Sequence, residues 1–140
     1  MKALTISEPW ASLIYAKEKH IETRSWETKY RGELFIHAGK TVNESLKELE
    51  VAMRKEIHFP KENRQGNIIA KCELTDCVKI DEDFIKEIKK NKREFISGIY
   101  KDGRFAWILD NIEPLKKNVP CSGHLRVWNI PSSVAKKIHV

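Results

Sequence analysis

Long hydrophobic runs are missing from this chain of 140 residues. No apolar stretch approaches the roughly 20 residues that a membrane-spanning helix needs. The N-terminal segment MKALTISEPW is apolar over too few residues for a signal peptide and turns polar by Ser7. We therefore expect a cytoplasmic protein that does not act at a membrane.

Cysteine is scarce in this chain. Cys72, Cys77 and Cys121 are odd in number and without close spacing, which favours reduced thiols over a disulfide framework. Cys121 and His124 form a single C-x-x-H pair, whereas a structural zinc site needs a second pair. No Ser-His-Asp pattern, paired-carboxylate spacing or set of metal ligands independently supports catalysis. We therefore predict that the protein uses neither a metal nor another cofactor.

Positive charge, in contrast, is present in excess. The chain carries 26 Lys and Arg residues against 20 Asp and Glu residues, a net charge of +6, and 41% of its residues are hydrophobic. These values predict one soluble globular domain over residues 1–140. A positive balance suits a polyanionic partner, and nucleic acid is the commonest one. Part of the excess lies in KEIKKNKR at residues 86–93, which is most simply the solvated face of a helix.

Apolar spacing and turn signals predict short strands interrupted by helices. The irregular alternation favours an α+β fold, a small mixed sheet of five or six strands that closes on itself, over a doubly wound parallel sheet. Residues 67–80 form the longest expected strand, which a bend or bulge could interrupt. We expect the other strands at residues 1–6, 20–26, 33–38, 104–109 and 125–129, with 111–115 continuing the strand at 104–109 as a second extended piece. Helices are expected at 10–17, 42–58, 82–95 and after Pro131.

The most informative segment is KHIETRSW at residues 19–26. In a strand, Glu22 and Arg24 point to the same face because side chains alternate. Lys19 lies where the preceding helix should end, so it could lean over that face. Two cations and an anion on one ledge could hold a polar, anionic ligand. The alternative is a solvated strand, or a salt-bridge network that only fixes the junction between helix and strand.

Several segments together resemble the ASCH domain family, whose members are relatives of the PUA RNA-binding fold. The family signature is a G-x-K-x-x-E-x-R string after the first helix. Lys19, Glu22 and Arg24 occupy its charged positions, and Lys17 stands where the family has glycine. The matching segments are KALTISEPWASLI, KHIETRSW, YRGELFIHAGK, IIAKCELTDCV, FAWILDNIEPL and VPCSGHLRVW. On these matches the chain is identified as a small stand-alone member of the prokaryotic or phage type.

The resemblance implies a PUA-like small mixed β-barrel with flanking helices, and a cleft lined by the signature residues. It also implies a ligand, either RNA or a nucleotide or nucleoside. Family members include domains attached to transcription coactivators, bacterial proteins reported to cut RNA, and amidohydrolases that deacetylate N4-acetylcytidine. The amidohydrolases carry threonine where Glu22 stands, so this chain lacks their proposed hydroxyl nucleophile.

Lys19 and Glu22 are the candidate catalytic residues. Lys19 could act as a base if desolvation lowers its pKa, and Glu22 could act as a base or accept a hydrogen bond from an exocyclic amine. The structural alternative is a salt-bridge network for Lys19, Glu22 and Arg24, a solvated charge for Arg31, and interior packing for Trp10 and His37. The predicted ligand-binding residues are Trp10, Lys19, Glu22, Arg24, Trp26, Arg31, His37 and Lys40.

Two smaller questions concern residues outside the signature. The resemblance implies that Ser122 and Gly123 donate hydrogen bonds to the ligand. In the strand at 67–80, Glu73 and Asp76 point to opposite faces, so only one of them can face the cleft unless a bulge intervenes.

Three hypotheses of function follow. The first is a binding module whose cleft holds RNA or a nucleotide. The second is a hydrolase that uses the same cleft, either a metal-independent ribonuclease or an amidohydrolase acting on a modified cytidine-like nucleoside. The third is a domain that binds a protein partner and no longer uses its cleft.

Overall fold

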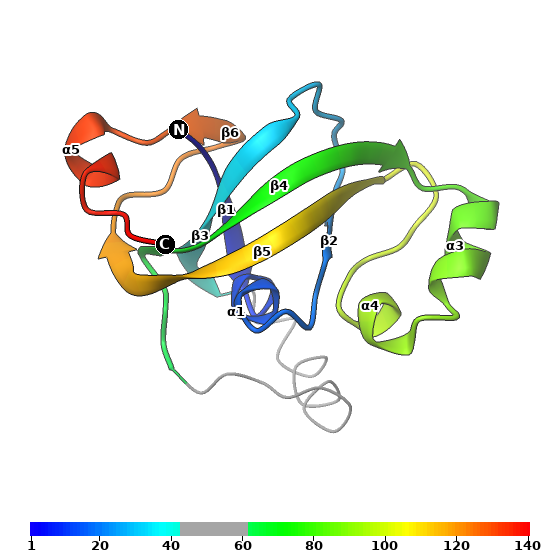
Figure 1. Cartoon of the computed structure of the whole chain (residues 1–140). Coiled ribbons are helices and arrows are strands. Elements are labelled where there is room, and N and C mark those ends of the chain that lie inside the picture. The colour runs from blue at the N-terminus through cyan, green and yellow to red at the C-terminus, as the bar shows by residue number, and fades with distance from the viewer. Residues whose placement is uncertain (43–61) are drawn as a thin grey trace.

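The computed structural model describes residues 1–42 and 62–140. Its centre is one six-stranded sheet with strand order β2-β5-β4-β3-β1-β6, which curls into a partial barrel (Figure 1). The strands are β1 (Lys2–Glu8), β2 (Ile21–Arg24), β3 (Gly32–Val42), β4 (Asn67–Lys79), β5 (Phe105–Pro120) and β6 (Val127–Asn129). The helices are α1 (Trp10–Tyr15), α3 (Glu82–Ile88), α4 (Lys92–Ile96) and α5 (Ser132–Ala135). The predicted α+β fold with a mixed, curled sheet is confirmed.

The sheet is mixed because β1 pairs in parallel with β3, whereas the other neighbouring strands are antiparallel. Register shifts interrupt the pairing of β4 with β5 at three places, between Ile68 and Ala70, between Lys71 and Glu73, and between Leu74 and Asp76. Such irregularities increase the local twist. The bulged strand predicted at 67–80 is therefore confirmed, and its bulges allow a short sheet to curl.

Two predicted boundaries are wrong. The longest strand is β5, with 16 residues against 13 in β4, because the pieces predicted at 104–109 and 111–115 join into one strand. Asn111 lies within this strand at a φ of 52°, so a left-handed residue bends the strand without ending it. The helix predicted at 82–95 is two helices. Asn91 starts the second one, since its side chain accepts a hydrogen bond from the backbone N–H of Glu94.

The main core lies between α1 and the concave sheet. Its buried side chains include Leu13 and Ile14 from α1 and Trp107 from β5. After α1 the chain turns sharply at Lys17, which has a φ of 61°. The backbone N–H of Lys17 bonds to the Ile14 carbonyl at 2.9 Å, and that of Glu18 to the Leu13 carbonyl at 3.0 Å. These two bonds form a Schellman motif, which usually contains glycine at the position of Lys17.

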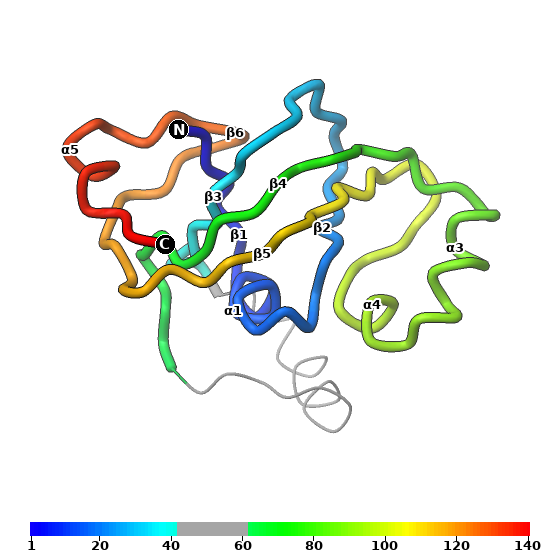
Figure 2. Tube along the Cα trace, in the orientation of Figure 1, coloured from blue at the N-terminus to red at the C-terminus, as the bar shows by residue number. Residues whose placement is uncertain are grey.

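The segment that joins α4 to β5 runs alongside β2 (Figure 2). The backbone N–H of Ile99 donates to the Thr23 hydroxyl at 3.2 Å, which ties the two segments together. The helix predicted at 42–58 falls almost wholly outside the described residues. That residues 1–140 form a single domain stays a prediction. In the described part of the chain, no helix is long and apolar enough to cross a membrane.

Candidate functional site

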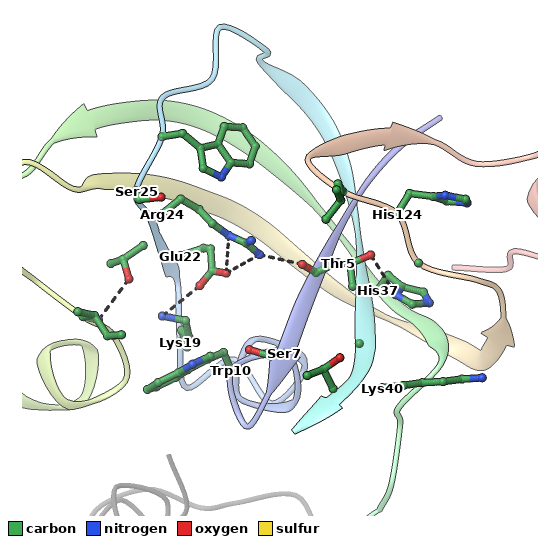
Figure 3. Close-up of a pocket in the computed structure, with 18 of the residues that line it drawn as sticks. Thr5, Ser7, Trp10, Lys19, Glu22, Arg24, Ser25, His37, Lys40 and His124 are labelled. Atoms are coloured by element: carbon green, nitrogen blue, oxygen red, sulfur yellow. Dashed lines mark hydrogen bonds and ion pairs between the residues drawn. The ribbon is translucent and has the colours of Figure 1, made fainter. Parts of the chain in front are cut away.

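A cavity of about 750 Å³ opens between α1, β2 and the loop that follows β5. Figure 3 shows Lys19 and Trp10 on one side of it, His37, His124 and Lys40 on the other, and Glu22 and Arg24 between them. The ledge predicted from alternation is therefore real, because Glu22 and Arg24 of β2 line the same cavity. Seven of the eight predicted ligand-binding residues line this cleft, namely Trp10, Lys19, Glu22, Arg24, Trp26, His37 and Lys40.

Lys19 forms the floor of the cleft and has no solvent-exposed surface. The turn at Lys17 directs it inward, where its Nζ donates at 2.5 Å to each of the Ile21 and Ser97 carbonyl oxygens. The ammonium also lies 5.2 Å from the ring centroid of Trp10, within the range of a cation–π interaction. Lys19 thus ties the junction of α1 and β2 to Ser97, which is 78 residues away in sequence, and this is the structural role that the sequence left open.

Glu22 stands above Lys19 and is held by both cations of the signature. One carboxylate oxygen lies 3.8 Å from the Lys19 Nζ, and the other lies 3.0 Å from a terminal guanidinium nitrogen of Arg24. Arg24 also donates to the Thr5 carbonyl at 2.8 Å, which fixes its guanidinium against β1. The side chain of Arg24 remains 25% exposed while that of Glu22 is 6% exposed. Arg24 is therefore the signature residue that solvent and a ligand reach most easily.

The charge state of Lys19 is set by opposing effects. Burial lowers the pKa of the Lys19 amine below its ordinary value, because desolvation disfavours the charged form. The carboxylates of Glu22 and Glu94 oppose this shift, and Arg24 adds to it. Burial is the largest of these effects, so the net direction is downward.

A second polar network builds the opposite wall. The His37 Nε2–H donates to the Cys121 carbonyl at 2.6 Å, so Nδ1 is left to accept from the Thr5 hydroxyl at 3.2 Å. The Trp128 indole N–H donates to the same hydroxyl at 3.0 Å. Desolvation lowers the pKa of His37, which favours this neutral tautomer. His37 is thus a bonded interior residue that also lines the cleft, and it anchors the loop after β5.

Other predicted residues lie elsewhere. Arg31 does not line the cleft, and the prediction that it binds the ligand gains no support from its position. Its guanidinium donates to the Thr28 carbonyl at 2.9 Å and lies 3.6 Å from the Asp76 carboxylate, because the turn directs it toward β4. Neither Glu73 nor Asp76, the two carboxylates of β4, lines the cleft.

The cleft also contains residues that the sequence did not suggest. Arg104 and Gly98 come from the segment before β5, and Thr5 and Ser7 come from β1. Glu94 lies just outside the cleft, where its carboxylate accepts from the His20 backbone N–H at 2.6 Å. A glutamate within an otherwise basic run was the available signal, but it gave no indication of a partner 74 residues away.

Comparison with known proteins now gives the family. The model of the ASCH domain matches residues 4–118. The chain belongs to the ASCH domain family. Lys17 takes the place of the signature glycine by adopting the left-handed conformation that glycine prefers. The narrower prediction, a small stand-alone member of the prokaryotic or phage type, stays a prediction.

Relatives of this ASCH domain include activating signal cointegrator 1 of Homo sapiens and of Mus musculus. Each is 28% identical over 137 residues, which cover 94% of this chain but only 22% of the relative. The chain thus spans about a fifth of the length of these curated relatives. Their full activities are therefore not transferred to it.

Solved structures support the fold independently. The crystal structure of ASCH from Zymomonas mobilis matches with a TM-score of 0.59 and 13% identity, over 97% of this chain and 91% of that one. A variant of the Zymomonas mobilis protein matches with a TM-score of 0.60 and 11% identity, over 97% of this chain and 94% of that one. At this identity the likeness shows the shared fold alone.

The described residues contain no group of three or more His, Cys, Asp or Glu side chains that could hold a metal ion. Charge and aromatic surface are what the cleft offers a ligand. Among the described residues, the cleft is lined by the cationic side chains of Lys19, Arg24, Lys40 and Arg104 and by one carboxylate, that of Glu22.

Proposed function

We propose that this ASCH domain binds RNA, or a nucleotide of RNA, in the cleft built on Lys19, Glu22 and Arg24. The observation that carries the proposal is the charge of the lining, in which the described residues supply four cations and one carboxylate around a cavity of about 750 Å³. A cavity of this size falls within the range of small-ligand sites. Phosphate groups are the natural partners of such a cationic lining.

The arrangement supports distinct roles for the three signature residues. Arg24 is the exposed one and offers its planar guanidinium to a phosphate. Glu22 offers carboxylate oxygens, which are the acceptors that an exocyclic amine of a base requires. Lys19 is fully buried and has two fixed carbonyl partners, so it supports Glu22 from below.

Titration with a short single-stranded RNA at two salt concentrations tests this proposal. Lys40 is exposed on the wall of the cleft, and Lys116 is exposed outside it, which makes them a matched pair. We expect Lys40→Gln to weaken binding and to reduce the slope of log affinity against log salt by about 0.7, the value for one phosphate contact on a single strand. Lys116→Gln should leave both quantities unchanged. Absence of binding by the unaltered protein at low salt would refute the proposal.

A second candidate function, hydrolysis in the same cleft, is favoured by the environment of Lys19. Two hydrogen-bond acceptors, the carbonyls of Ile21 and Ser97, are fixed at its Nζ. A neutral amine could keep both bonds and still hold its lone pair free, and burial lowers the pKa of Lys19 toward that neutral form. The substrate would be RNA or a modified cytidine-like nucleoside.

If the cleft hydrolyses its ligand, a reaction product should be detectable. RNA and N4-acetylcytidine are incubated with the protein and with Lys19→Met, and cleaved RNA or free cytidine is measured by chromatography. Turnover that disappears in the folded Lys19→Met variant supports hydrolysis. Binding without any product in the unaltered protein rejects hydrolysis and leaves the binding module.

A further inference from the structure

Two exposed apolar side chains stand at the mouth of the cleft. Among the described residues, four large hydrophobic side chains are exposed, and two of these, Met1 and Val140, are at the ends of the sequence. The other two are Leu125, which is 93% exposed, and Ile99, which is 36% exposed, and both line the cleft. Single exposed apolar residues are common, but these two border the cavity and are placed where a ligand in the cleft would meet them.

An aromatic platform lies beside Leu125. Trp26 is half-buried and rests edge-on against Trp107, with ring centroids 4.8 Å apart. The guanidinium of Arg126 lies 4.9 Å from the Trp26 ring centroid. Arg126 holds this position with a φ of 59°, a conformation that side chains other than glycine seldom adopt. Arg126 and Trp26 are thus placed as a planar, cationic surface at the rim.

The two sides of the mouth come from different segments. Ile99 lies in the segment before β5, next to Thr23 of β2, and Leu125 lies in the loop after β5. The cationic floor with Glu22 and Arg24 lies in the same cavity. A ligand that fits the whole surface is anionic at its centre and carries flat apolar groups that extend past the rim. A mononucleotide has one such group, and a single strand has one at every step.

We propose that the cleft receives one nucleotide of a single-stranded nucleic acid whose flanking bases pack on the rim, one against Leu125 and the Trp26–Arg126 pair, the other against Ile99. This inference rests on the proposed function and narrows it from a free nucleotide to an oligonucleotide of at least three residues. Charge complementarity favours a nucleic acid over an apolar peptide, since the lining residues that the structure describes include four cations and one carboxylate. Stacking on aromatic and guanidinium planes is the usual way in which unpaired bases are held.

Three probes separate stacking from charge. They are cytidine 5′-monophosphate, an RNA trinucleotide with cytosine at its centre, and the same trinucleotide with both flanking bases removed. The full trinucleotide should bind about tenfold or more tightly than the monophosphate, because each stacked base adds about fivefold or more in single-strand complexes and two bases are stacked here. The abasic trinucleotide carries the same phosphates and should lose most of this gain. Calorimetric titration at one salt concentration measures all three.

Variants at the rim test the residues themselves. Leu125→Ala removes an exposed side chain and should leave the fold intact. It should lower the affinity for the full trinucleotide by roughly fivefold and leave the affinity for the monophosphate unchanged. Arg126→Lys keeps the positive charge but removes the planar guanidinium. It should therefore also lower the affinity for the full trinucleotide alone. Val140→Ala is the matched control, because Val140 is an exposed apolar residue outside the cleft. That control should change no affinity.

Several outcomes would overturn the inference. Equal affinities for the monophosphate and the full trinucleotide would reject it and leave the proposed function standing. Equal affinities for the full and abasic trinucleotides would assign the gain to phosphates alone. If no probe binds, the proposed function fails and the inference fails with it. If sedimentation shows a dimer that Leu125→Ala converts to a monomer, the rim is a contact between two copies of this chain.

Discussion

Lys19→Met tests whether the buried lysine holds the cleft together. Methionine keeps the length of the side chain and removes only the amine. Lys29 is an exposed lysine outside the cleft, so Lys29→Met serves as the matched control. The substitution at Lys19 should destabilise the fold strongly, and that at Lys29 should change it little.

The size of the effect follows from the contacts of the amine. Without it, the Ile21 and Ser97 carbonyls lose their donor, and a buried acceptor without a partner costs about 1–3 kcal/mol. Glu22 also loses a cation, and breaking a buried ion pair from one side costs about 3–5 kcal/mol. Removal of a buried ammonium recovers part of this cost. We expect a net loss of about 3 kcal/mol near pH 7.

The cost of Lys19→Met should also grow with pH. The pKa of Lys19 is lowered in the folded state, so over the range between that pKa and 10.5 the unfolded chain binds more protons than the folded one. Stability from this group therefore rises with pH in that range. The variant lacks the group, and the difference between the two proteins widens. The raised pKa values of Cys72, Tyr30 and Tyr100 affect the pH dependence of both proteins and cancel in the comparison.

Urea unfolding followed by tryptophan fluorescence measures this difference near pH 7 and near pH 10. A loss of about 3 kcal/mol corresponds to a fall of roughly 10 °C in the melting temperature of a domain of this size. A loss below about 1 kcal/mol, equal to that of Lys29→Met, would show that the contacts of the Lys19 amine contribute nothing to stability. A difference that shrinks toward high pH would show that the pKa of Lys19 is raised.

Three further outcomes are expected. Lys17→Gly should raise stability by about 0.5–1 kcal/mol in urea unfolding, because glycine adopts the left-handed conformation without strain, and a loss would refute the assignment of this helix end. Gly123→Ala should destabilise the loop after β5, because a Cβ there would lie 2.8 Å from the Thr5 hydroxyl and 3.0 Å from the His37 ring, and an unchanged melting temperature would contradict that packing. Cys72 should resist iodoacetamide in the folded protein at about pH 8, because burial raises its pKa to about 12, and mass spectrometry showing rapid labelling would contradict its burial.

The fold was predictable where local chemistry and core packing agree. β1, α1 and β3 begin close to the positions that Pro9 and the apolar runs predict. The errors occur where a non-glycine residue takes a glycine-like conformation or where one side chain starts a new helix. Asn111 passes through a φ of 52° without ending β5, and Asn91 divides a helix that amphipathic spacing makes continuous. Spacing alone does not reveal either event, because both depend on one residue's conformation.

In the candidate site, the relation between residues close in sequence was predictable, whereas contacts between distant segments were not. Alternation places Glu22 and Arg24 on one ledge, and the structure confirms that geometry. The segment before β5 brings Arg104 into the cleft, and α4 brings Glu94 against His20 just outside it. Nothing in the local sequence indicates those contacts. Arg31, a basic residue in a nearby turn, pairs with Asp76 of β4, which is another contact that the local sequence does not indicate. Local patterns specify faces, whereas tertiary contacts decide which faces meet.

The sequence left two roles open for Lys19, contact with a ligand and a structural role at the junction of helix and strand. The burial of Lys19 connects these two roles. A lysine that bound a ligand directly would keep a free donor at the surface, but Lys19 has no exposed surface and directs its Nζ at two backbone carbonyls. The anion above it, Glu22, is paired with Arg24 as well, so the carboxylate is held in one place before any ligand arrives. Preorganisation of this kind reduces the entropy lost on binding. Under the proposed function, the contacts of Lys19 act by holding Glu22 and Arg24 in place, and a variant that removes these contacts should weaken RNA binding through those two residues.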